Sequence, residues 1–133
     1  MLGPSWRLRA SNTQSQAITV TVKGRYFKFS PDGSLVFSAE QTLIAAVSVA
    51  ATTGSTVSAT VDNSTDKYLG MMLTAEFTAA AATDSTKAVV LTLERSTDAG
   101  TTFPSQDLGI SAGGHTLLAA DATTARRKNF TVR

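Results

Sequence analysis

The sequence predicts an all-β fold, a single antiparallel β-sandwich or jelly roll with extended terminal segments. Three observations lead to this prediction. Apolar and polar residues alternate along short segments, turn residues separate these segments at close spacing, and no segment has the apolar repeat of an amphipathic helix. A parallel α/β fold is excluded because it needs crossover connections, usually helices, between its strands.

The chain of 133 residues is long enough for one domain with one hydrophobic core. We expect an N-terminal arm over residues 1–16 and the sandwich over residues 17–133. Residues 1–16 lack the continuous apolar segment of a signal peptide, and no stretch reaches the roughly 18 apolar residues that a membrane span needs. We therefore expect a cytoplasmic protein unless it is packaged into something larger.

The first predicted strand covers residues 17–29, in which aliphatic residues alternate with small or polar ones. These aliphatic residues are Ile18, Val20 and Val22. Gly24 is expected to mark a bulge or bend before the strand continues. Residues 30–34, with the sequence SPDGS, predict a hairpin turn, because the proline presets the first turn angle and the glycine tolerates a positive φ. The chain should then return antiparallel over residues 34–38.

Residues 42–51 contain enough alanine for a helix, but their β-branched residues favour a strand. A further strand follows over residues 55–63 and ends in a turn at DNSTD, and the strongest strand patterns lie in residues 67–79 and 87–96. Their expected inward side chains are Leu69, Met71, Leu73, Ala75 and Phe77 in the first segment and Val89, Leu91 and Leu93 in the second. Short segments over residues 108–111, 115–120 and 128–133 follow, the last as a terminal strand.

The residue types that most enzymes require are scarce. The chain has no cysteine and one histidine, His115, which excludes disulfides, thiol chemistry and two-histidine metal sites. A triad of His115 with Ser111 and Asp121 would lack a nucleophile elbow, so we interpret His115 as an exposed loop residue. Glu76 and Glu94 could lie on adjacent strands like a glycosidase pair, but opposite the aliphatic face, which favours solvated or interface charges. The sequence thus predicts a protein that is not an enzyme, with no catalytic residue and no cofactor.

Two polar segments, DNSTD over residues 62–66 and STDAGTT over residues 96–102, resemble fragments of calcium-binding loops. Neither has the acidic density of an EF-hand loop, and turn formation explains both. No metal site is predicted, although a structural cation is compatible with these turns.

The segment RYFKF interleaves basic and aromatic residues, as strands that bind nucleic acid do. We expect Phe27 and Phe29 to pack in the core, which leaves Tyr26 and Lys28 outside. The sequence therefore does not favour nucleic acid as a partner.

The net charge of +2 is distributed unevenly. Residues 1–28 carry five basic residues and no acidic one, residues 29–125 carry a net charge of −7, and residues 126–133 carry +4. Blocks of opposite sign suit copies of one chain that dock basic end to acidic face. Trp6 lies in the first basic block and packs either on its own domain or on a neighbouring subunit. The expected assembly contacts are Trp6, Arg7, Arg9, Arg126, Arg127 and Lys128.

The middle of the chain, from Thr42 to Phe103, resembles a recurring type of small virion protein of tailed bacteriophages. The resemblance lies in GSTVSATVDNSTDKYLGMMLTAEFTAAAATDS followed by KAVVLTLERSTDAGTTFP. These segments comprise a small-residue strand, a DN turn, an apolar strand beginning YL, an Ala/Thr/Ser-rich loop, and a strand ending in a Ser-x-Asp-x-Gly turn. The resemblance implies a jelly-roll head-decoration, cement or tail-accessory subunit without catalytic residues. Ala99 stands where related turns often have a second glycine.

From these observations we expect a non-enzymatic bacteriophage virion protein, most simply a capsid decoration or cement subunit that bridges neighbouring capsomers. The alternative is a tail, baseplate or head–tail joining subunit. A third function, a glycan-binding sandwich for host attachment, would depend on Trp6, Tyr26 and Tyr68. The expected partners are the major capsid protein or other virion subunits and copies of the chain itself, without a membrane. The expected location is the virion, after assembly in the bacterial cytoplasm.

Overall fold

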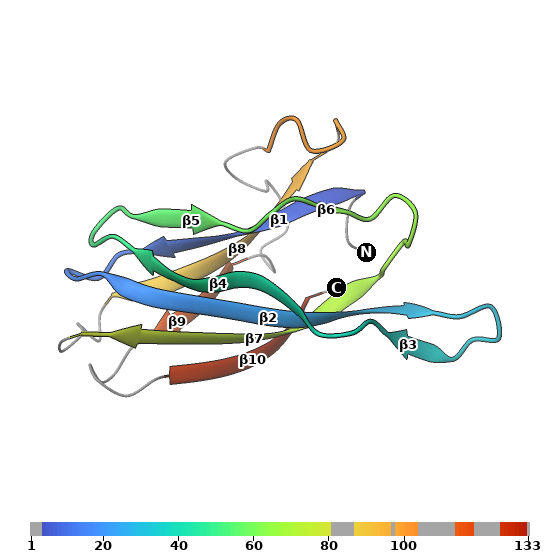
Figure 1. The fold of residues 1–133 in the computed structure, drawn as a ribbon, viewed down its shortest axis with the longest axis horizontal. Helices are drawn as coiled ribbons and strands as arrows, with labels where there is room; N and C mark the ends of the chain where they lie inside the picture. The colour runs from blue at the N-terminus through green and yellow to red at the C-terminus, as the bar shows by residue number, and fades with distance from the viewer. Residues whose placement is uncertain (1–3, 81–86, 97, 104–113, 119–125, 133) are drawn as a thin grey trace.

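The structure, a computed structural model of the chain, describes residues 4–80, 87–96, 98–103, 114–118 and 126–132. Within these residues, ten strands form two five-stranded antiparallel sheets that pack against each other (Figure 1). No helix occurs in the described ranges. The predicted all-β sandwich is therefore confirmed.

The strands divide between the sheets as follows. Sheet A contains β5 (Ser55–Val57), β1 (Ser5–Asn12), β8 (Ala88–Ser96) and β9 (Gly114–Leu118) in that order, and β6 (Val61–Asp62) also pairs with β1. Sheet B contains β10 (Arg126–Val132), β7 (Gly70–Ala79), β2 (Ile18–Phe29) and β3 (Leu35–Phe37) in that order, and β4 (Gln41–Val49) also pairs with β2. The consecutive strands β1 and β2 lie in different sheets, as do β7 and β8, so the chain crosses between the sheets at both connections.

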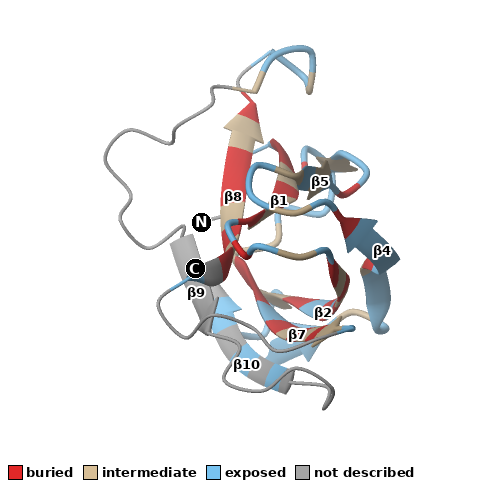
Figure 2. Ribbon diagram, turned by 90° about the vertical axis from the view of Figure 1, so that its left-hand side faces the viewer, coloured by how far each residue is buried: buried red, intermediate tan, exposed pale blue. Residues whose placement is uncertain are grey.

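The core lies between the two sheets, and the buried residues lie mainly on β1, β2, β7 and β8 (Figure 2). The inward residues are Met71, Leu73, Ala75 and Phe77 on β7 and Val89, Leu91 and Leu93 on β8, each at most 3% exposed. The sequence predicts these residues correctly, because successive side chains of a strand point to opposite faces. Burial of a leucine or phenylalanine side chain stabilises the fold by about 1.5–3 kcal/mol, so this alternation fixes the register of both strands.

The N-terminal arm predicted over residues 1–16 is wrong, because residues 5–12 form β1, which pairs with β8 along its whole length. Trp6, Leu8 and Ala10 are buried in the core, while the residues between them point outward. This is the two-residue period of a strand. The charged residues at alternate positions favour a solvated arm when only the sequence is considered. Pairing with the distant strand β8 makes this segment a strand instead. The extended N-terminal segment thus belongs to the sandwich.

Two buried amide side chains hold the connection from β1 to β2. Nδ2 of Asn12 donates to the carbonyl oxygen of Gln16 at 2.8 Å, and Oδ1 of Asn12 accepts from the backbone N–H of Gln14 at 2.9 Å. Nε2 of Gln14 in turn donates to the carbonyl oxygen of Lys87 at 2.8 Å. Because buried polar groups require such partners, this connection is fixed to the rest of the domain.

Strand β2 keeps one continuous register with β7 through Gly24, so of the predicted bulge or bend the bulge is absent from this pairing. A Cβ atom at Gly24 would lie 2.6 Å from Cδ2 of Leu73, so close packing explains the glycine. The unbroken alternation places Tyr26 inward (8% exposed) and leaves Phe29 61% exposed. The prediction that Phe27 and Phe29 enter the core and that Tyr26 stays outside is therefore wrong. Bulges occur instead in the pairing of β2 with β4.

The β2–β3 hairpin is confirmed. The backbone N–H of Ser30 donates to the carbonyl oxygen of Ser34, and that of Gly33 to Ser30, both at 2.9 Å. Gly33 has a φ of 84°, which glycine adopts without strain. The predicted strands at residues 42–51 and at the C-terminus are also confirmed, as β4 and β10. Residues 55–63 form two short strands, β5 and β6, rather than one, and residues 108–111 lie outside the described residues.

Candidate interaction surfaces

Trp6 is not accessible to a neighbouring subunit. Its side chain is fully buried and meets the ring of Tyr26 edge to face, with 5.5 Å between the ring centroids. Of the two interpretations of Trp6, packing on its own domain is confirmed. Its prediction as an assembly contact is wrong, because strand pairing turns the even-numbered residues of β1 toward the core.

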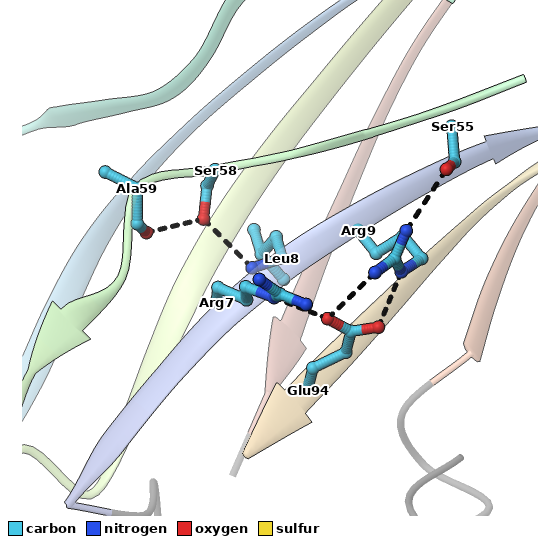
Figure 3. Close-up of polar contacts among 7 residues, drawn as sticks. All are labelled: Arg7, Leu8, Arg9, Ser55, Ser58, Ala59 and Glu94. Atoms are coloured by element: carbon cyan, nitrogen blue, oxygen red, sulfur yellow. Dashed lines mark hydrogen bonds and ion pairs between the residues drawn. The ribbon is translucent and has the colours of Figure 1, made fainter. Parts of the chain in front are cut away.

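Three charged side chains form a cluster on the outer face of sheet A (Figure 3). Arg7 lies directly opposite Glu94 in the β1–β8 pairing, and its Nε donates to Oε2 of Glu94 at 2.6 Å. Nε of Arg9 donates to Oε1 of Glu94 at 2.5 Å, and its Nη1 donates to Oγ of Ser55 at 3.1 Å. Cζ of Arg7 also lies 4.1 Å from the ring centroid of Phe103. The carboxylate of Glu94 therefore accepts hydrogen bonds from two guanidinium groups on both of its oxygens, which is a strong form of ion pair.

The two arginines keep Glu94 ionised although its side chain is only 3% exposed. Burial raises the pKa of Glu94, but the hydrogen bonds and charges of Arg9 and Arg7 outweigh it, so the pKa lies below the ordinary value of 4.5. The side chains of Arg7 and Arg9 are 24% and 33% exposed. Both residues thus stabilise the sandwich itself, and a contact with another subunit stays a prediction for their exposed parts.

Of the two interpretations of Glu94, a solvated charge is wrong because its side chain is buried, and an interface charge stays a prediction. Glu76 and Glu94 also do not lie on adjacent strands. Glu76 is on β7 of sheet B and Glu94 on β8 of sheet A, and both point outward, to opposite sides of the sandwich. Glu76 has its own partner, since Nη2 of Arg127 lies 2.5 Å from its Oε2. The two carboxylates therefore cannot act together on one bond.

The basic residues near the C-terminus lie on β10. Arg127 points outward and its side chain is 68% exposed. The side chains of Arg126 and Lys128 lie outside the described part of the structure. The assignment of these three residues as assembly contacts stays a prediction.

His115 lies on β9 rather than in the predicted loop, whereas Ser111 and Asp121 lie outside the described residues. In the segment STDAGTT, Oδ1 of Asp98 accepts hydrogen bonds from Oγ of Ser96 at 2.5 Å and from the N–H of Thr102 at 2.8 Å. These bonds hold the pKa of Asp98 well below its ordinary value. Turn formation thus accounts for this segment, as the sequence predicts.

The part of the chain that the structure describes contains no group of three or more aspartate, glutamate or histidine side chains that could hold a metal ion. No helix in that part has the length and apolar composition needed to cross a membrane.

An exposed apolar surface that the sequence did not predict lies on the β2–β3 hairpin. It consists of Phe27, Phe29, Leu35, Phe37 and Met72, which we call the hairpin patch. Phe29 is 61% exposed, Met72 51%, Leu35 48% and Phe37 42%. The register explains the cluster: Phe27 pairs with Phe37 and Phe29 with Leu35, so all four lie on the outer face of sheet B. In Figure 1 the hairpin extends beyond the neighbouring strands, and the unbroken alternation in β2 was the sequence signal that could have identified it.

A groove of about 510 Å³ runs along the hairpin patch. The remainder of the outer face of sheet B is polar, and its charges pair with one another: Nζ of Lys23 lies 3.6 Å from Oε1 of Glu40, and Arg127 pairs with Glu76. Arg25 lies at the boundary between the two parts, opposite Met72 in the β2–β7 pairing. This face of the sandwich is therefore apolar at the hairpin and polar beyond it.

Comparisons of the chain with models of protein families, with curated proteins and with solved structures find no match, so its function has to be argued from these surfaces.

Proposed function

We propose that this protein is a non-enzymatic structural subunit of a bacteriophage virion, a capsid decoration or cement protein that bridges neighbouring capsomers. The observation that carries the proposal is the hairpin patch, where four large apolar side chains are 42–61% exposed. Single apolar residues on a surface are ordinary, but a contiguous group of them indicates a surface that another molecule covers. The segment from Thr42 to Phe103 resembles small virion proteins, and this resemblance indicates that the assembly is a virion.

The organisation of the domain supports this role. The core between the sheets and the pairing of Arg7 and Arg9 with Glu94 make the sandwich self-contained, so that contacts with neighbours are not needed to complete it. The hairpin presents its apolar residues on a projecting element. The exposed Arg127 on β10 and the partly exposed Arg7 and Arg9 of the cluster on sheet A would add charged contacts at the rim of an interface. Such contacts, repeated around a shell, would add area that opposes internal pressure.

A tail, baseplate or head–tail joining subunit is the alternative, since the same surfaces would serve there. A glycan-binding role has less support, because its three aromatic residues do not form an exposed platform. Trp6 and Tyr26 are buried, and Nζ of Lys28 lies 5.0 Å from the ring centroid of the half-buried Tyr68. A sugar would have no pair of exposed rings among these residues on which to stack.

The test is binding of the purified protein to virus particles that lack it. Emptied heads and isolated tails are incubated separately with the protein, pelleted, and imaged by cryo-electron microscopy. We expect saturable binding and density at repeated positions on the heads. Binding to tails alone would replace decoration by the tail alternative, and binding to neither would contradict a virion role.

A second measurement examines the basic contacts. Changing both Arg126 and Arg127 to alanine should leave thermal unfolding nearly unchanged, yet weaken attachment and alter its dependence on salt. Unchanged occupancy of the particles would show that Arg126 and Arg127 do not contribute to the interface, which would then lie on the other surfaces.

A further inference from the structure

The hairpin patch lies between two opposite charges on the same hairpin. Arg25 precedes the patch on β2, on the same face as Phe27 and Phe29, and Asp32 follows it at the tip of the turn. The order along the hairpin is therefore cation, two pairs of apolar residues, and anion. The two ends of the patch therefore carry opposite charges. Such a surface can be complementary to a second copy of itself that is related by a twofold rotation.

Both charges lie at the surface of the described part of the chain. Arg25 is exposed and forms no ion pair with any described residue, in contrast to Lys23 two positions before it. Asp32 is also exposed, and hydrogen bonds from Ser30 and Ser34 lower its pKa to about 2. The hydroxyl of Ser30 and the backbone N–H of Ser34 both donate to Oδ1 of Asp32. At any ordinary pH the tip therefore carries an exposed negative charge.

We propose that a second copy of this chain covers the hairpin patch, with the two hairpins packed face to face and antiparallel. The twofold axis would lie in the interface and cross β2 near the pair Lys28–Val36. A strand rises by about 3.3 Å per residue, so Arg25, three residues before Lys28, would lie about 10 Å from this axis. Asp32 is four residues after Lys28, but the chain reverses in the turn, so Asp32 would lie at a similar distance on the other side of the axis. Each Arg25 would then face Asp32 of the second copy, with the apolar pairs between the two ion pairs.

The opposite orientation is disfavoured by charge. If the two hairpins packed in parallel, each Arg25 would face Arg25 of the second copy, and each Asp32 would face its equivalent. Like charges placed opposite each other in an interface oppose association and specify the other orientation. The groove of about 510 Å³ along the patch gives the apolar side chains of the second copy a place to pack. This inference rests on the assembly role proposed above and names one neighbour in it.

The test uses the full chain in solution, without virus particles. Sedimentation equilibrium and size-exclusion chromatography with light scattering are measured over a wide range of concentration. We expect a monomer–dimer equilibrium, which Phe29→Ser should shift strongly toward monomer. Arg25→Glu should weaken the dimer by at least about tenfold, because both ion pairs become repulsive. Asp32→Asn should also weaken it, while its amide oxygen can still accept the turn hydrogen bonds.

Lys87→Glu is the matched control, since it makes the same change in charge at an exposed position before β8, away from the hairpin. Urea unfolding of each variant shows that the domain is intact. A protein that is monomeric at every concentration would overturn the inference, as would a dimer that Arg25→Glu and Lys87→Glu affect equally. If the protein is monomeric but still decorates heads, the dimer is contradicted and the proposed function is not. Another virion protein would then cover the hairpin patch. A dimer that binds neither heads nor tails would contradict the proposed function alone.

Discussion

Strand β1 and the β2–β3 hairpin both place an aromatic residue among basic ones, yet the two regions use it in opposite ways. Trp6 on β1 is fully buried, whereas Phe29 on β2 is 61% exposed. β1 has paired strands on both sides and contributes its inner face to the core. Phe29 lies near the hairpin turn, on the outer face of sheet B. The place of a strand in the sheets, rather than the residue type, therefore decides which aromatic side chain stabilises the fold.

The charges of the two regions differ in the same way. Arg7 and Arg9 share the buried carboxylate of Glu94, whereas Arg25 has no ion pair with a described residue. A charge that is paired at the edge of the core contributes to folding, because removing its partner leaves a desolvated charge. An exposed, unpaired charge contributes little to folding and remains available for association.

Substitution of the two aromatic residues gives the largest expected contrast. Trp6→Ala should lower the free energy of unfolding by about 3–5 kcal/mol, because it leaves a cavity between the sheets. Phe29→Ala should change it by less than about 0.5 kcal/mol, because the ring is mostly solvated. Urea titration of both variants, at a concentration where the monomer predominates, measures the difference. Equal losses would mean that the hairpin patch is part of the core after all.

The arginines give the next contrast. Changing both Arg7 and Arg9 to alanine should destabilise the fold by about 2–3 kcal/mol, because the carboxylate of Glu94 loses its partners. Arg25→Ala should stay within about 0.5 kcal/mol of the wild type. Adding Glu94→Leu to the double variant should recover most of the loss, since an apolar replacement of a buried ion pair is often tolerated. If stability is not recovered, the arginine side chains would stabilise the fold through their packing rather than through their charge.

Local alternation predicted the inward residues of β7 and β8, and turn chemistry predicted the hairpin at Gly33. Both depend on residues close together in the chain. The partner of Arg7 lies 87 positions away, and no local pattern specifies that pairing. The prediction that Glu76 and Glu94 lie on adjacent strands is wrong for the same reason. Which sheet a strand joins depends on which distant strands it pairs with.

The hairpin patch was missed for a different reason. A glycine inside a strand is compatible with a bulge or with a close approach of another side chain, and the two alternatives give opposite faces to every later residue. At Gly24 the close approach of Leu73 is the correct explanation. One local choice thus decided whether Phe27 and Phe29 were assigned to the core or to a surface.

Acid should weaken the contribution of Glu94. Its pKa in the folded protein lies below the ordinary value of 4.5, so its stabilising effect is fully present above that pH and is lost as the pH falls through the lower folded value. Glu94→Gln should therefore cost about 1–2 kcal/mol at neutral pH and progressively less below pH 4.5. Urea titrations over this range compare the two proteins. A difference that stays constant with pH would show that the ion pairs with Arg7 and Arg9 contribute no net stability.

The smallest expected effect concerns Tyr26, the inward neighbour of Phe27 on β2. Burial and, to a smaller extent, the charge of the nearby Tyr68 together raise the pKa of Tyr26 to about 12. Because the folded pKa lies above the ordinary value of 10.0, the associated stability is present below that pH and is lost as the pH rises toward 12. Tyr26→Phe should change stability by less than about 0.5 kcal/mol at neutral pH, and should reduce the loss in alkali. Tyr68→Phe keeps the hydroxyl of Tyr26 and should retain most of that loss. Unfolding measured along an alkaline titration, with phenolate absorbance recorded in parallel, separates the two variants. If Tyr26 ionised at its ordinary value without unfolding, its side chain would be solvated, and the contrast between the inner and outer faces of the hairpin would not hold.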